Sequence, residues 1–161
     1  MSTLTTSTDP VQFVVHEGRL LNEGRHEEWL SLFAPEGCYW VPLAGDRQSD
    51  PHGHASLAYE DRILLATRIR RLQGPRAHSL APGVRSVHVL QQPGLTGATE
   101  DGCLLVQTPF HYTEARGNRQ FQLAGVWCHR LRPTAQGLRI VLKRVNLVNA
   151  TAAHEAIQLF P

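Results

Sequence analysis

The sequence predicts an α+β protein in which helices come first along the chain and a long antiparallel sheet comes last. Up to residue 73, apolar residues recur with the helical period of about 3.6, and from residue 84 they alternate as in half-buried strands. This order of elements packs the helices on one face of the sheet. The chain has 161 residues, of which 42% are hydrophobic and 19% charged, so we expect a single domain over residues 1–161.

The first helix has a clear start signal. Asp9 can cap a helix that begins with Pro10, and the spacing of the apolar residues that follow predicts a helix over residues 10–23. Residues 1–9 lack the basic start and the apolar core of a signal peptide. We expect them to form a short, flexible N-terminus.

Two further helices are predicted before residue 75. Residues 26–33 favour a short helix, which a proline and a glycine end, and a strand is expected over residues 38–43. The polar stretch 46–56 predicts a loop. Residues 57–72 then place apolar side chains at helical spacing, and Gly74 ends this third helix.

The second half of the chain predicts a meander of strands joined by turns. The strands are expected at residues 84–92, 104–114, 119–131 and 138–148. Residues 94–102 predict a turn-rich connection, and Gly125 within a strand indicates a bend or bulge. We expect a strongly curved sheet wrapped around the helices, as in the cystatin-like cone folds.

Composition excludes several classes of protein. The formal net charge is only +2, which gives no case for nucleic-acid binding. No segment approaches the roughly 18 consecutive apolar residues of a membrane span. Cys38, Cys103 and Cys128 are odd in number and widely separated, which favours reduced thiols. We expect a soluble, cytoplasmic protein.

The candidate metal ligands form no complete set. His52 and His54 lie in the polar loop without a second ligand pair at metal spacing. Cys128 and His129 are adjacent in a predicted strand, where side chains alternate between faces, so they do not suit an iron–sulfur cluster. His26, after Glu23, has no obvious third ligand for mononuclear iron. We expect no metal in this chain.

Acid–base chemistry remains an open alternative. Nucleophile and phosphate-binding motifs are absent. A cone-shaped fold can bind a small molecule in its mouth, where a histidine beside a carboxylate or hydroxyl could move protons. The candidate pairs are His78 with Asp61 and His111 with Tyr112.

Several stretches together resemble the small, or β, subunit of aromatic-ring-hydroxylating dioxygenases of the Rieske non-haem iron type. They span residues 20–43, 56–79 and 142–149, in order over nearly the whole chain. The most specific piece is Tyr59-Glu60-Asp61-Arg62, which we expect in the third helix, followed by Ala77-His78-Ser79.

The resemblance implies a cystatin-like (NTF2-like) cone with a curved, mostly antiparallel six-stranded sheet. It implies assembly with a large α subunit, three copies of each. In such enzymes the α subunit carries the Rieske [2Fe-2S] cluster and the catalytic iron, and the β subunit is mainly structural. The reaction implied is NAD(P)H-driven cis-dihydroxylation of an aromatic ring by O2, and the last residues favour members that act on aromatic carboxylates.

The leading hypothesis is therefore a non-catalytic subunit without a cofactor of its own. An arginine-rich stretch suits pairing with carboxylates across a protein contact better than nucleic acid. The candidate interface residues are Tyr59, Arg62, Arg68, Arg70, Arg71, Arg76, His78 and Arg85. A free-standing cone-fold dehydratase or isomerase is the alternative, and a small-ligand binding module is a third possibility.

Overall fold

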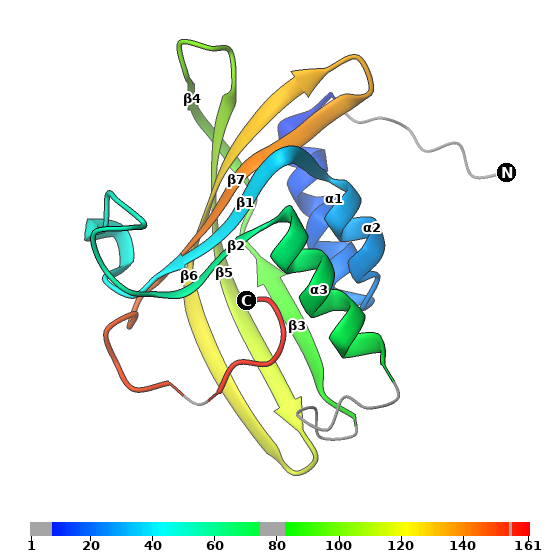
Figure 1. Cartoon of the computed structure of the whole chain (residues 1–161), viewed down its shortest axis with the longest axis vertical. Helices are drawn as coiled ribbons and strands as arrows, with labels where there is room; N and C mark the ends of the chain where they lie inside the picture. Colours follow the sequence, from blue (N-terminus) through cyan, green and yellow to red (C-terminus); the bar gives the residue numbers. More distant parts are fainter. Residues whose placement is uncertain (1–7, 75–82, 155) are drawn as a thin grey trace, which may run out of the picture.

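A computed structural model describes residues 8–74, 83–154 and 156–161 of the chain. A long, strongly curved sheet forms one layer, and the helices lie together on one of its faces (Figure 1). The α+β fold and the mostly antiparallel curved sheet predicted from the sequence are confirmed.

Three helices and seven strands make up the part of the chain that the structure describes. The helices are α1 (Pro10–Asn22), α2 (His26–Ser31) and α3 (Arg62–Gln73), and a short 3-10 turn, η1, spans Gly45–Arg47. The strands are β1 (Phe33–Pro42), β2 (Ser56–Asp61), β3 (Arg85–Leu90), β4 (Gly94–Ala98), β5 (Leu104–Arg116), β6 (Arg119–Thr134) and β7 (Gly137–Leu147). The longest three, β5, β6 and β7, form the predicted meander.

The strands follow the order β2-β1-β7-β6-β5-β3 across the sheet. Strand β1 runs parallel to β7, and the other neighbouring pairs are antiparallel. Strand β4 shares one edge of β5 with β3, because β3 pairs with residues 110–115 and β4 with residues 104–107. The described sheet is thus six strands wide, and two short strands occupy its last position.

The predicted start of the third helix at residue 57 is wrong. Ser56–Asp61 forms β2, which pairs with β1 and alternates in burial. Helix α3 begins at Arg62, where the Asp61 carboxylate accepts a hydrogen bond of 2.9 Å from the amide of Leu64. The Tyr59-Glu60-Asp61-Arg62 stretch is therefore the junction between a strand and a helix rather than one turn of a helix.

Two other boundaries differ from the predictions. Helix α2 ends at Ser31, and β1 begins at Phe33, before the proline and glycine that were expected to separate them. The pairing of β1 with β7 shifts register between Phe33 and Cys38, which accommodates Pro35 in a strand. Residues 94–98 form β4 rather than a connection; every residue of β4 is exposed, so no apolar alternation marks it in the sequence.

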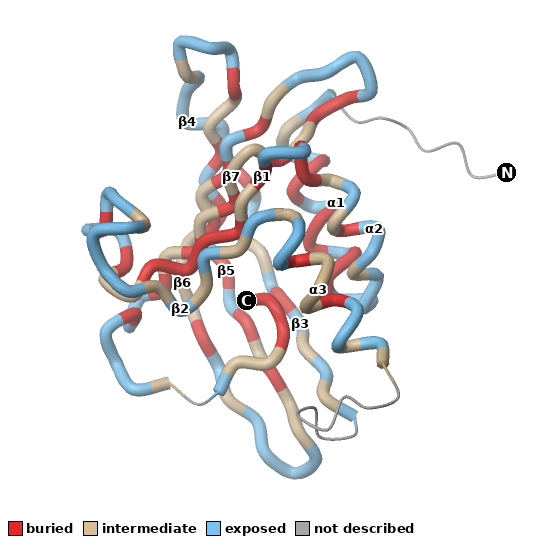
Figure 2. The backbone as a smooth tube through the Cα atoms, viewed as in Figure 1, coloured by how far each residue is buried: buried red, intermediate tan, exposed pale blue. Residues whose placement is uncertain are grey.

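The hydrophobic core lies between the helices and the concave face of the sheet. Figure 2 shows buried residues at intervals along the long strands and along the helices. The large side chains at its centre are Trp29, Tyr39, Tyr112, Trp127 and Phe160. No helix in the described ranges is long and apolar enough to cross a membrane.

Gly125 permits a close approach of two backbones. It lies opposite Phe110 of β5 and Leu147 of β7, and the register is continuous there. A Cβ at this position would lie 2.2 Å from the carbonyl oxygen of Asn146. Of the bend or bulge expected at Gly125, the bulge is not found, because the register of β6 with β7 shifts instead between Arg130 and Leu131.

We expect Gly125→Ala to lower the free energy of unfolding by about 1–3 kcal/mol, because overpacking forces the strands apart. Gly97→Ala is the matched control, since a Cβ at Gly97 of the exposed β4 meets nothing within 4 Å. Urea denaturation of both variants measures the difference. Equal unfolding midpoints would show that the backbone contact has no cost.

Candidate functional site in the mouth of the cone

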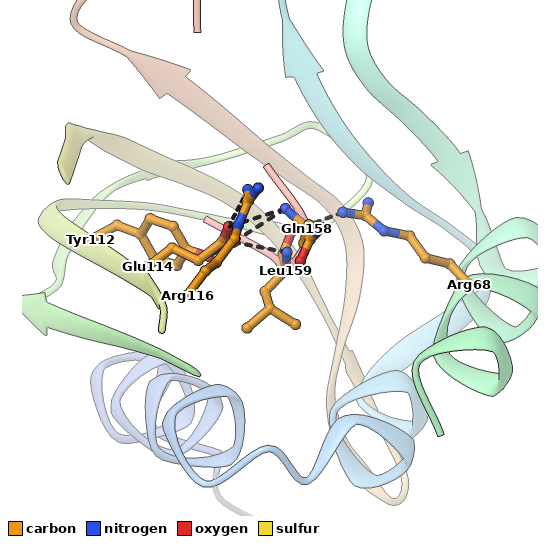
Figure 3. A network of polar contacts seen from close by, with 6 residues as sticks. All are labelled: Arg68, Tyr112, Glu114, Arg116, Gln158 and Leu159. Atoms are coloured by element: carbon orange, nitrogen blue, oxygen red, sulfur yellow. Dashed lines mark hydrogen bonds and ion pairs between the residues drawn. The ribbon is translucent and has the colours of Figure 1, made fainter. Parts of the chain in front are cut away.

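The last residues of the chain enter the space between the sheet and the helices. The C-terminal end lies near β3 and α3 (Figure 1), and Figure 3 shows residues 158 and 159 between Glu114 and Arg68. We call residues 158–161 the docked segment. It lies at the mouth of the cone, where a fold of this shape offers a ligand site.

A buried carboxylate on β5 holds the docked segment. Glu114 is fully buried, and its Oε1 accepts hydrogen bonds from the amide of Leu159 at 2.9 Å and from the hydroxyl of Tyr112 at 2.8 Å (Figure 3). The amide of Gln158 donates to both carboxylate oxygens. Arg116 neutralises the carboxylate at 2.8 Å from Oε2. Hydrogen bonds to a charged acceptor contribute about 1.5–3 kcal/mol each.

Three further side chains donate to main-chain oxygens of the segment. Arg68 of α3 donates to Leu159 at 2.8 Å and also forms an ion pair with Glu60. The Nε2 atom of His88 lies 2.9 Å from the carbonyl oxygen of Phe160. It donates to this oxygen in the tautomer that carries the proton on Nε2. The hydroxyl of Tyr39 donates to the main-chain oxygen of Pro161 at 2.9 Å.

The aromatic ring of Phe160 anchors the segment. Its side chain is 1% exposed. The ring centroid lies 4.6 Å from that of Trp29 and 5.8 Å from that of Tyr39. The edge of His26 and the guanidinium of Arg68 complete the contacts with this ring, the latter 4.3 Å from its centroid.

A second buried network lies deeper, between α1 and the sheet. Glu17 accepts hydrogen bonds from Lys143 at 2.7 Å and from the indole of Trp29 at 2.9 Å, and His129 lies 2.6 Å from its other oxygen. Glu17, Lys143 and His129 are all buried. The ammonium of Lys143 also lies 3.4 Å from the ring centroid of Trp127.

The surroundings shift the pKa values of these buried groups. Burial alone would raise the pKa of Glu17, but the charges and hydrogen bonds of Lys143 and His129 lower it well below its usual range. Burial, with the nearby charge of Lys143, lowers the pKa of His88 to about 3. Burial raises the pKa values of Tyr39 and of Tyr112, the latter also through the charge of Glu114.

The interior is therefore filled by the protein's own groups. Glu17, Glu114 and His88 each bond to atoms of this chain rather than face open space. Beside the docked segment a cavity of about 260 Å³ remains, with Tyr39 and Arg68 among its lining residues. The arrangement suits binding of the docked segment.

The predicted interface residues within the described ranges differ in their surroundings. Arg68 turns inward to the docked segment, and Arg62 donates to the carbonyl oxygen of Phe33 at 3.3 Å. The exposed members in the described ranges are Tyr59, Arg70, Arg71 and Arg85. Arg76 and His78 lie outside the described residues.

Of the two candidate acid–base pairs, only His111 with Tyr112 lies wholly within the described residues, and the structure separates these two side chains. His111 is exposed and Tyr112 is buried, because neighbouring residues of β5 face opposite sides of the sheet. The carboxylate of Asp61 caps α3. Its proposed partner, His78, falls outside the described residues.

The candidate metal ligands either lie on opposite faces of a strand, contact other residues or lie exposed in a loop. Cys128 and His129 lie on opposite faces of β6, as the alternation predicts, and His129 contacts Glu17. His52 and His54 are exposed in the loop before β2. Within residues 8–74, 83–154 and 156–161, no three histidine, cysteine or acidic side chains come together to hold a metal.

Sequence reasoning missed the buried charges Glu17, Glu114 and Lys143. A signal was available for each. Glu17 lies three or four residues from four apolar positions of the first helix, which are Phe13, Val14, Leu20 and Leu21. Glu114 continues the buried alternation of Tyr112, and Lys143 continues that of Val145. A charged residue on a buried face predicts a buried partner.

Stability should fall as the pH falls from about 6.5, because unfolded His88 takes up a proton at its ordinary pKa whereas the folded ring does so only near 3. The loss steepens below about 4.5, where unfolded Glu17 is protonated. The variant His88→Gln retains a donor for the carbonyl oxygen of Phe160. Between pH 6.5 and 4.5, its free energy of unfolding should change less steeply with pH than that of the wild type, by up to about 1.4 kcal/mol per pH unit. Urea denaturation across this range measures it.

The free energy of unfolding of the variant should still fall with pH in this range, because burial also lowers the pKa of His26. Between pH 7.5 and 8.5 both proteins should show the same slope, because these imidazoles are neutral in either state. An unchanged slope in His88→Gln below pH 6.5 would contradict the buried, neutral state of this ring.

Comparison with known proteins agrees with this geometry. The family model for the ring hydroxylating beta subunit matches residues 16–154. The small subunit of 2-halobenzoate 1,2-dioxygenase from Burkholderia cepacia is 30% identical over 165 residues, covering 99% of both chains. The β subunit of benzoate 1,2-dioxygenase from Burkholderia mallei has a TM-score of 0.71 at 22% identity, covering 92% of this chain and 96% of that one.

A chain of naphthalene 1,2-dioxygenase shares the fold as well. Its TM-score is 0.74 at 16% identity, and the match covers 93% of this chain and 82% of that one. The order of the elements, the closed cone and the match of the family model over most of the chain lead to one conclusion. This chain belongs to the β subunit family of aromatic-ring-hydroxylating dioxygenases.

Proposed function

We propose that this β subunit is non-catalytic and that it holds the large, iron-containing α subunits of a dioxygenase in register. The observation that carries the proposal is the closed interior: the docked segment occupies the mouth of the cone, and the buried polar groups there bond to it. A subunit with a filled interior acts through its outer surface.

The exposed edge of the sheet offers a surface for the partner. Strand β2 is an edge strand, so one side of its backbone has no neighbouring strand in the described sheet. Leu57, Tyr59, Ile63 and Leu64 are large apolar side chains that lie exposed on β2 and the first turn of α3. We call these four residues the β2–α3 patch. Arg70 and Arg71, also exposed, add positive charge on the same helix.

In this proposal the α subunit supplies the redox chemistry. It carries the Rieske [2Fe-2S] cluster and the mononuclear iron, and three copies of each subunit form the assembly. The donor sets of the described residues support this division, because the histidines on the concave face bond to Glu17 and Phe160. This chain contributes the position of the α subunits and no step of the reaction.

Aromatic carboxylates are the proposed class of substrate for the assembled enzyme, which would insert both atoms of O2 into the ring with electrons from NAD(P)H. The names of the relatives support this class: the small subunit of 2-halobenzoate 1,2-dioxygenase is 30% identical over 165 residues, and the β subunit of toluate 1,2-dioxygenase is 30% identical over 107 residues. We also propose that the enzyme works in the cytoplasm, where the free thiols of Cys38, Cys103 and Cys128 stay reduced.

No feature of the described residues favours a dehydratase or isomerase, or a small-ligand binding module, over the proposed function. A dehydratase or isomerase needs an acid–base pair in an accessible mouth, and His111 and Tyr112 lie on opposite faces of the sheet. A small-ligand binding module needs an open apolar interior, whereas the ring of Phe160 packs against Trp29 and Tyr39 in this one.

Ile63→Glu should abolish co-purification with the α subunit, because a buried, unpaired carboxylate in the contact would cost several kcal/mol. Val148→Glu is the matched control: Ile63 is 76% exposed and Val148 is 78% exposed, but Val148 follows β7 and does not belong to the β2–α3 patch. Both variants should keep the thermal midpoint of the isolated chain.

The measurement is co-expression with a tagged α subunit, followed by sizing of the purified complex. Assembly that survives Ile63→Glu but fails with Val148→Glu would place the contact on another face. A β subunit that ignores the α subunit altogether would refute the proposed function.

A further inference from the structure

The docked segment is held as a peptide ligand is held. Its polar contacts run from side chains of the body to main-chain atoms of the segment. Glu114 of β5, Arg68 of α3, His88 of β3 and Tyr39 of β1 each contact the main chain at 2.8 to 2.9 Å. Four elements that are distant in sequence therefore converge on consecutive residues.

Leu159, Phe160 and Pro161 of the segment are buried, and the largest of these side chains, Phe160, has the aromatic contacts. Phe160 is buried against the ring systems of Trp29, Tyr39 and His26, under the guanidinium of Arg68. Recognition of the main chain together with one aromatic anchor is how proteins bind short peptides.

The connection between β7 and the docked segment is largely exposed. Val148, Asn149 and residues 151–153 are exposed, whereas Ala150 is buried in the core. The amide of Val148 donates to Ala124, and the amide of Ala152 closes a turn on Asn149. The exposed residues 151–153 separate Ala150 from the docked segment, which has polar contacts of its own.

We propose that the mouth of the cone is a peptide-binding site, filled in cis by residues 158–161, and that it accepts the same segment in trans from a second copy of this chain. A cavity of about 260 Å³ lies directly beside the segment, between Leu159 and Pro161 on one side and Tyr39 and Arg68 on the other, so the segment does not fill the whole site. An assembly with several small subunits would bring such segments close together, although the binding itself needs no α subunit.

The test cuts the covalent connection between the segment and the rest of the chain after the protein has folded. A protease site placed in the exposed residues 151–153 is cleaved after folding, and the released segment is exchanged against a fluorescent peptide of residues 156–161. We expect saturable binding by fluorescence anisotropy and displacement by excess unlabelled peptide. A peptide with Phe160→Ala should bind at least roughly tenfold more weakly, because it lacks the aromatic anchor.

A cleaved protein that keeps its circular dichroism but binds no peptide at about 1 mM would overturn the proposal. Equal binding of the Phe160→Ala peptide would also overturn it. If cleavage unfolds the protein, the uncut Phe160→Ala chain provides the second test. The wild-type peptide should displace the weakened segment of this variant and raise its thermal midpoint. The same peptide should leave the thermal midpoint of the wild-type chain unchanged. The absence of a rise in the variant would also contradict the proposal.

Discussion

The carboxylate of Glu114 fixes the end of the chain in the mouth of the cone, and the closed interior depends on this contact. Burial of a carboxylate costs several kcal/mol unless it is paired and hydrogen-bonded. Arg116, Tyr112 and two main-chain amides of the docked segment meet that requirement (Figure 3). The carboxylate and the segment therefore need each other, because removal of either leaves buried polar groups without partners.

The deeper network follows the same physical rule. Glu17 links α1 to β6 and β7 through His129 and Lys143, so the helix has a defined position over the curved sheet. Hydrophobic packing alone would allow the helix to slide, whereas a buried ion pair tolerates little displacement. The networks of Glu17 and Glu114 thus both occupy the space inside the cone, where a ligand could otherwise bind. The outer surface remains for contact with a partner.

Much of this fold could be predicted because its signals are local. The cap at Asp9 and the alternation of the last three strands need no knowledge of the rest of the chain. Strand β2 was missed because its residues also fit a helical spacing, and pairing with β1 decided the outcome. The docked segment was missed because Glu114 meets it across 45 residues of sequence, and no short pattern records such a contact.

Hydrogen–deuterium exchange at the amide of Leu159 tests the closed mouth most directly. This amide donates to a buried carboxylate, so it should exchange as slowly as amides in the core of β6. Residues 151–153, which are exposed, should exchange rapidly in the same sample and serve as the internal reference. Exchange of the Leu159 amide at the rate of residues 151–153 would mean that the mouth is open in solution, and it would contradict the account of a closed subunit.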